Sequence, residues 1–135
     1  MNWENLITTL VGGLLTLAGG YIQQCRAEET QKEQQIRQDK INIIKDITSS
    51  KTAILNTNSD NNAKTKFNGA LNLIPIIFQD NEEILNAHKN FCDNLLKTSD
   101  TNSSNKNLYN LIMLMHEDVG FKKIPYEQFI ITLSV

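Results

Sequence analysis

The chain has 135 residues, which is enough for one small domain and one additional element. Its net charge is −2, with 13 Lys and Arg against 15 Asp and Glu, which excludes a global charge that would draw it to nucleic acid or to an anionic surface. Cys25 and Cys92 lie far apart and form no metal-ligand spacing, so we expect two free thiols.

The first predicted element is the apolar stretch from Leu6 to Ile22, which contains no charged residue. Trp3 precedes it and Tyr21 lies near its end, and at ~1.5 Å of helix per residue these rings are ~27 Å apart. Aromatic rings at both borders of an apolar helix of this length are typical of a membrane span. We therefore predict that residues 1–22 form a transmembrane segment.

Two alternatives apply to this stretch. A cleaved signal peptide needs a positively charged start, whereas residues 1–5 contain Glu4 and no Lys or Arg. A buried core helix is the second alternative, but four glycines weaken it as a soluble helix. Because the first basic residue is Arg26, the positive-inside rule predicts an outside N-terminus and a cytoplasmic C-terminal part, with one crossing of the inner or cell membrane.

One side of the predicted span carries small residues. This small-residue face consists of Thr8, Thr9, Gly12, Gly13, Thr16 and Gly20. Small residues let helix backbones approach closely, and Thr hydroxyls bond across such contacts. We predict a homo-oligomer, suspected to be a tetramer, in which this face either packs helices together or lines a narrow pore.

The next stretch, residues 23–55, contains no Gly or Pro and is expected to be helical. It begins with polar residues and acquires an apolar face at Ile36, Ile43, Ile47 and Ile54. We expect the span to continue into this helix without a break, as a stalk whose end is the first helix of a bundle.

Residues 64–135 form the predicted cytoplasmic helical domain. Polar loops are expected at 56–64 and 98–105, and amphipathic periodicity predicts helices at 64–78, 80–97 and 106–119. The predicted fold class is all-α, namely a single transmembrane helix, a long stalk helix and a small helical bundle.

Individual residues mark the expected helix ends. Pro75 should kink its helix or end the regular part near Ile74. Asp80 with a Glu three residues later resembles a capping box, and Gly120 suits the position after a last turn. Pro125 fits the first turn of a short helix or an extended turn, in an apolar tail that should dock on the bundle or on a neighbouring subunit.

A cluster of basic residues near the first polar loop is the candidate ligand site. It contains Lys51, Lys64 and Lys66, with Phe67 beside them. Repeated around the axis of an oligomer, such residues would hold the phosphates of an oligonucleotide, while Phe67 or Tyr109 stacks on its bases. The alternative is an ordinary solvated surface, because acidic residues are interleaved with these lysines.

No motif in the sequence indicates catalysis, so we expect no enzyme, no metal and no cofactor. His88 lies on a predicted apolar stripe with Ile84, Phe91 and Leu95, which favours a core histidine over a ligand. Residues 116–118, His-Glu-Asp, lack the spacing for metal coordination and are interpreted as a solvated helix end.

Three segments carry a family resemblance, and they read NIIKDITSSKTAIL, FNGALNLIPIIFQDNEEILNAHKNFCDNLL and LYNLIMLMHEDVGF. In this order, over residues 36–135, they resemble the bacterial and phage family DUF6680. The resemblance is strongest from Ala70 to Phe78 and in the helix that follows. The family pattern has an Arg ahead of the polar loop, where Lys51 is the nearest basic residue here. The family name implies no function.

The overall plan is also similar to the transmembrane effector of the Hailong anti-phage system, in which a nucleotidyltransferase controls a membrane partner. That similarity implies a homotetrameric ion channel whose cytoplasmic part binds a DNA oligomer. The leading hypothesis is a pore-forming anti-phage effector, controlled by a nucleotide or oligonucleotide, whose partners are membrane lipid and a nucleotidyltransferase or its product. The alternative is a membrane-tethered helical adaptor, such as a phage exclusion protein.

Overall fold

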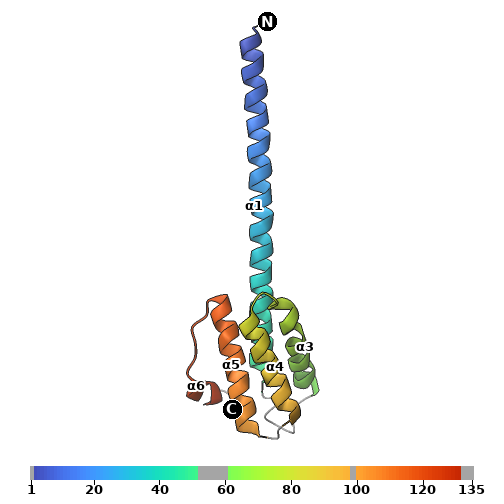
Figure 1. Ribbon diagram of the computed structural model, residues 1–135, viewed down its shortest axis with the longest axis vertical. Coiled ribbons are helices and arrows are strands. Elements are labelled where there is room, and N and C mark those ends of the chain that lie inside the picture. Colours follow the sequence, from blue (N-terminus) through green and yellow to red (C-terminus); the bar gives the residue numbers. More distant parts are fainter. Residues whose placement is uncertain (1, 52–60, 98–99, 132–135) are drawn as a thin grey trace. The chain divides into compact units, whose positions relative to one another are not determined.

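The computed structural model describes residues 2–51, 61–97 and 100–131, and for residues 130 and 131 it describes the backbone alone. Within these ranges every regular element is a helix (Figure 1), which confirms the all-α prediction. The helices are α1 (Trp3–Ser50), α3 (Asn61–Ile77), α4 (Glu82–Lys97), α5 (Thr101–Val119) and α6 (Tyr126–Ile131). The chain divides into two compact units, Met1–Ile36 and Arg37–Val135.

The first unit is the N-terminal part of α1. The helix runs without interruption from Trp3 to Ser50, which confirms that the apolar stretch continues into the stalk helix. Every described side chain before Arg37 is exposed, including Ile36, which the periodicity had assigned to the apolar face. That assignment is wrong, because the buried side chains of α1 all belong to the second unit. The remainder of the predicted stalk helix, residues 52–55, lies outside the described residues.

The second unit is a helical bundle that includes the last part of α1. Within it, α4 lies between α3 and α5 (Figure 1). Each helix contributes side chains to one apolar core, among them Ile47 from α1, Ile74 from α3, Phe91 from α4, Leu111 from α5 and Phe129 from α6. The last part of α1, from residue 37 to residue 50, is therefore the first core helix of this bundle.

Pro75 lies inside α3, which continues to Ile77, so of the two effects predicted for it the end of the regular helix near Ile74 does not occur. The helix also begins three residues earlier than expected, at Asn61. Without an N–H on Pro75, the carbonyl of Leu71 loses its usual helical donor. The Nε2 atom of His88 lies 3.0 Å from this carbonyl oxygen and takes the place of that donor. His88 is thus a half-buried residue that satisfies the α3 backbone, in agreement with the predicted structural role.

The residues that cap α4 and α5 explain why the predicted starts of these two helices are wrong. Asn81, not Asp80, caps α4, because its Oδ1 accepts from the N–H of Ile84 at 3.3 Å. Helix α5 begins at Thr101 instead of residue 106, because the Asp100 carboxylate accepts from the Asn102 N–H and from the Ser103 hydroxyl. The hydrogen bond from Ser103 is the main cause that lowers the pKa of Asp100.

The C-terminal end of α5 follows the prediction. Gly120 has φ = 83°, a left-handed conformation that favours glycine, and the Phe121 N–H donates to the His116 carbonyl at 2.8 Å. The chain then returns to the bundle as α6, where the buried Phe129 ring contacts the Tyr109 ring edge-on. Docking of the tail on the bundle is therefore confirmed for its described part.

The apolar stripe of α4 is narrower than predicted. Ile84, Ala87 and Phe91 are buried, whereas Leu95 is exposed. Leu96, which was expected beside the stripe, is 87% exposed. Both leucines belong to the last turn of α4, where the described part of the bundle no longer covers this helix.

Candidate membrane span and ligand pocket

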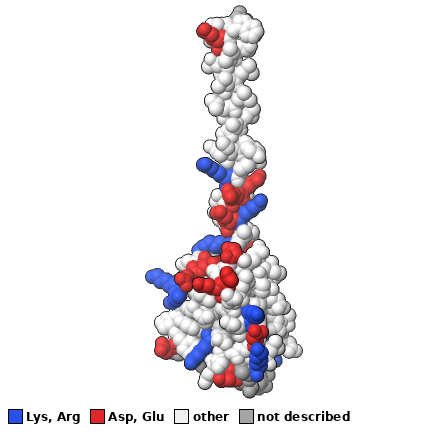
Figure 2. Space-filling view, in the orientation of Figure 1, with Lys and Arg blue, Asp and Glu red and all other residues white. Residues whose placement is uncertain are grey.

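The N-terminal part of α1 has the length and composition of a membrane span. It is the one described helix that is long and apolar enough to cross a bilayer, and no residue of its apolar window is buried. Figure 2 shows this stretch as surface without charged side chains, in keeping with the absence of charge between Glu4 and Arg26. Trp3 and Tyr21, the predicted border aromatics, are both more than two-thirds exposed.

The small-residue face lies entirely on this exposed part of α1. Its hydroxyl groups are bonded within the helix, since Thr8, Thr9 and Thr16 donate to the carbonyls of Glu4, Asn5 and Gly12 at 2.8–2.9 Å. Its glycines are open, because a Cβ added at Gly12, Gly13 or Gly20 meets no atom within 4 Å. No described atom within 4 Å of these glycines therefore explains why the positions are small.

The predicted ligand residues do not form one basic surface. Lys51 is 4% exposed and Phe67 is 2% exposed, with its ring edge-on to Phe91 at 6.3 Å. Lys64 is exposed, and Lys66 forms a partly exposed ion pair with Asp46 at 3.5 Å. Phe67 thus has no face open for stacking on a base, because the apolar face of α3 turns it into the core.

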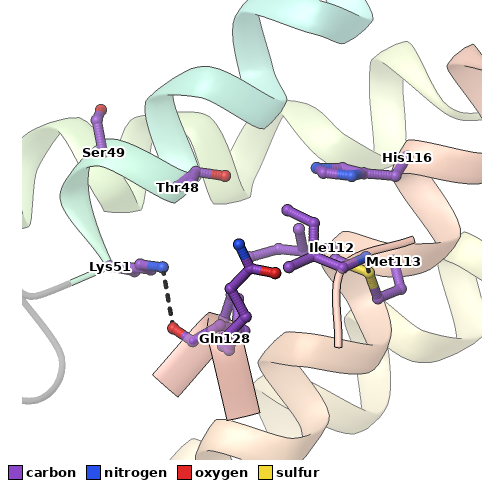
Figure 3. Close-up of a pocket in the computed structure, with 9 residues that line it drawn as sticks. Thr48, Ser49, Lys51, Ile112, Met113, His116 and Gln128 are labelled. Carbon is purple, nitrogen blue, oxygen red and sulfur yellow. Dashed lines mark hydrogen bonds between the residues drawn. The ribbon is translucent and has the colours of Figure 1, made fainter. Parts of the chain in front are cut away.

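Lys51 instead lines a pocket of about 360 Å³ in the bundle (Figure 3). The end of α1 supplies Thr48, Ser49 and Lys51, α5 supplies the residues on the other side, and the chain from Ile124 to Phe129 closes it. Among the described residues, the lining consists of Thr48, Ser49, Lys51, Ile112, Met113, His116, Ile124, Gln128 and Phe129. Sequence reasoning missed Thr48, His116 and Gln128, because nothing in a linear pattern joins positions about 80 residues apart.

The ammonium group of Lys51 lies over the Phe129 ring, 4.2 Å from its centroid, and donates to the Phe129 carbonyl at 3.5 Å. Burial lowers the pKa of Lys51, because the charged form loses hydration in this apolar surrounding. Thr48 has a buried hydroxyl oxygen with no hydrogen-bond partner among the described residues. The pocket therefore combines a buried cation with an unused polar group.

A second buried lysine, Lys40, is held by an ionic network. Its Nζ lies 2.8 Å from Asp118 Oδ2 and 3.4 Å from Asp80 Oδ1, and Asn81 donates to the other oxygen of Asp118 at 2.9 Å. Burial alone would lower the pKa of Lys40, but the two carboxylates outweigh it and raise that pKa. Arg37 adds a 3.0 Å hydrogen bond to the Val119 carbonyl.

This network corrects the interpretation of residues 116–118 as a solvated helix end. Asp118 has a side chain only 16% exposed, and His116 is buried with its ring edge-on to Phe121. Only Glu117 is exposed as expected, in an ion pair with Lys123 at 3.4 Å. The sequence could not reveal this, because the partner lysine lies 78 residues earlier.

Comparison with protein families gives one informative match. The family described as a family of unknown function, DUF6680, matches residues 3–133 of the chain. Comparison with curated proteins and with solved structures gave no significant match. The family match includes the apolar part of α1 as well as the bundle, so the two units occur together in the family pattern.

Proposed function

We propose that this chain, which belongs to the DUF6680 family, is a single-pass membrane protein that assembles with copies of itself into a ligand-controlled pore. In this proposal residues 6–22 cross the bilayer and the bundle lies in the cytoplasm. The exposed, uncharged helix supports the crossing. The location of every Lys and Arg at or after residue 26 supports the orientation.

The observation that carries self-association is the unexplained glycine content of α1. Each glycine in a helix interior costs about 1 kcal/mol relative to alanine. A Cβ at Gly12, Gly13, Gly19 or Gly20 would meet nothing within 4 Å, so the described chain gives no packing reason for these residues. The close approach of a second helix supplies such a reason, since small-residue faces bring backbones into contact.

The threonines of this face suit either a packed or a pore-lining position. Their protons are already donated to carbonyls of the same helix, so no donor is left unsatisfied in lipid. The remaining lone pairs of each hydroxyl oxygen stay available to a neighbouring helix or to water in a pore. We assign the small-residue face to the inner helix contacts of the oligomer, which border the pore.

Control by a ligand is supported by the position of the pocket. Thr48 and Ser49 line it and belong to the same helix that carries the span. The similarity of plan to the Hailong effector favours an anti-phage role with a nucleotide or oligonucleotide as ligand and a nucleotidyltransferase as its source. Opening of the pore would then dissipate ion gradients and stop the growth of an infected cell.

Ion flux from liposomes tests the pore. Full-length protein reconstituted into liposomes loaded with an ion-sensitive dye should allow ion flux, and chemical cross-linking should capture its oligomers. The double substitution Gly12→Leu with Gly20→Leu should abolish both the flux and the cross-linked oligomers. Ala18→Leu is the control, because it introduces the same side chain on the opposite side of the helix and should preserve both. Absence of flux with and without added oligonucleotide would argue against a pore.

A change of anchor separates the pore from a tethered adaptor. Residues 1–22 are replaced by an unrelated Leu-rich span, and cells are challenged with phage. A pore loses protection, because its conducting face is gone. An adaptor keeps protection, because its bundle is still held at the membrane.

A further inference from the structure

The small-residue face of α1 is part of a longer row that has a carboxylate at each end. Residues four apart in a helix lie next to one another, so every fourth residue forms a row along the helix surface. The row that starts at Glu4 contains two threonines and two glycines of the small-residue face, and all its members are exposed. It consists of Glu4, Thr8, Gly12, Thr16, Gly20, Gln24 and Glu28. The row is therefore uncharged except at its two ends.

The length of this row matches the thickness of a bilayer. Glu4 and Glu28 are separated by ~36 Å at ~1.5 Å of helix per residue, whereas the hydrocarbon core measures ~30 Å. Both carboxylates can thus lie among the lipid headgroups while the residues between them cross the core. The Thr8 hydroxyl donates to the Glu4 carbonyl at 2.8 Å, so the first charged residue is part of the same regular helix.

The carboxylate of Glu4 has no basic side chain near it in the sequence. The first Lys or Arg of the chain is Arg26, and the ion pairs found among the described residues do not include Glu4. At the other end of the row the charge is partly balanced. Lys32 follows Glu28 by four residues, a spacing at which opposite charges attract, whereas Arg26 lies roughly 200° around the helix from Glu28. Glu4 is therefore the dominant charge of the row.

We propose that the pore conducts cations in preference to anions, and that Glu4 at its outer mouth determines this preference. The inference rests on the proposed function. When the small-residue faces of several copies meet, their Glu4 carboxylates surround one mouth. A ring of carboxylates concentrates cations and repels anions, and the low-dielectric surroundings strengthen its field. Thr8 and Thr16 add neutral oxygen atoms along the path, so no second charge is needed inside the membrane.

Currents through planar bilayers of uncharged lipid that contain the full-length protein test the selectivity. In a gradient of KCl, the reversal potential gives the permeability of K⁺ relative to Cl⁻, which should exceed about tenfold. Glu4→Gln should abolish the preference, and Glu4→Lys should reverse it. Glu28→Gln should lower it less, because Lys32 already balances part of that charge. Glu33→Gln, the matched change at an exposed glutamate outside the row, should leave it unchanged.

Disulfide cross-linking tests the position of Glu4 without requiring a current. In membranes treated with copper phenanthroline, Glu4→Cys in a Cys25→Ser background should form disulfides between copies. Leu6→Cys in the same background should not, because Leu6 lies roughly 200° around the helix from Glu4. Far-UV circular dichroism should show the same helix content for each variant and the wild type.

The outcomes separate the selectivity from the pore. Equal selectivity of wild type and Glu4→Gln, or a current without preference for cations, would overturn the role of Glu4 and leave the pore intact. Absence of cross-links at Glu4→Cys would place this residue away from the mouth and would also overturn its role. Absence of any current would contradict the pore itself, and the selectivity with it.

Discussion

The two ends of α1 are parts of one continuous helix with opposite surroundings. Near the N-terminus, residues such as Leu10 and Leu14 are exposed, although this part is the most apolar of the chain. Near the C-terminus, Ile43 and Ile47 are buried against other helices of the bundle. Helix formation alone therefore does not decide burial, because tertiary neighbours do. An exposed apolar helix of this length is the physical basis for the proposal that lipid and further copies of the chain cover it.

The largest expected effect comes from making the same substitution at both ends. Ile47→Ala should lower the free energy of unfolding by about 3 kcal/mol, because it leaves a cavity at a position with 0% exposure. Ile7→Ala should change it by less than about 0.5 kcal/mol, because Ile7 contacts no core. Urea unfolding of the full-length protein, followed by far-UV circular dichroism, measures both. Equal losses at the two positions would show that the N-terminal part also packs within the folded chain.

A smaller effect is expected where the buried part of α1 begins. Asp118→Ala should destabilise the bundle by about 2 kcal/mol, because it leaves Lys40 buried beside only the largely exposed Asp80. Glu117→Ala breaks an exposed pair with Lys123 and should cost about 0.5 kcal/mol or less. In a double-mutant cycle, Lys40→Met with Asp118→Leu should cost less than the sum of the single changes. Additive losses would contradict a direct coupling of the two residues.

The dependence of the free energy of unfolding on pH in the acid range gives a separate test of this network. Burial alone would raise the pKa of Asp118, but hydrogen bonds from Lys40 and Asn81 outweigh it and lower that pKa below its ordinary value of 3.8. The stabilisation is then fully present above pH 3.8 and disappears as the pH falls through the lower value of the folded state. Asp118→Asn should therefore be less stable than wild type at neutral pH, and the difference should shrink in acid. A difference that stays constant with pH would contradict the network.

Much of the fold follows from local patterns in the sequence. The uncharged stretch before Arg26, the periodicity of the isoleucines at 43 and 47, and the position of Gly120 each depend on neighbours within a few residues. The starts of the helices were harder to predict. Asp100 and Asn81 cap their helices through hydrogen bonds that depend on backbone geometry, and a neighbour such as Asp80 is an equally suitable cap by residue type. The early end of α3 that Pro75 suggested does not occur, and His88 from another helix lies in place of the missing donor.

The candidate sites divide in the same way. The small-residue face is a property of one helix, so its positions are predictable from spacing alone. The pocket is not, because it joins Thr48 to Gln128 and depends on where α6 returns to the bundle. The lysines were judged by number and proximity in the sequence, whereas their chemistry depends on burial. Lys51 and Lys40 are both buried, yet only a tertiary structure shows that Lys40 lies between two carboxylates and Lys51 over the Phe129 ring.

The smallest expected effect compares these two lysines. Lys51→Met should raise the free energy of unfolding by up to about 1 kcal/mol at pH 7, because it removes a cation that burial disfavours and keeps an apolar side chain. Since burial lowers the folded-state pKa of Lys51 below 10.5, the wild type gains stability as pH rises from that lower value toward 10.5, and the advantage of the variant should shrink. Lys40→Met should have the opposite sign, with a loss at pH 7 that persists up to pH 10.5, because the pKa of Lys40 is raised and its stabilisation is lost only above that. Thermal unfolding between pH 7 and 10.5 distinguishes the two. A clear loss of stability for Lys51→Met would mean that the contacts of Lys51 with the Phe129 ring and carbonyl outweigh its desolvation. Lys51 would then stabilise the end of α1 as Lys40 stabilises the start of its buried part.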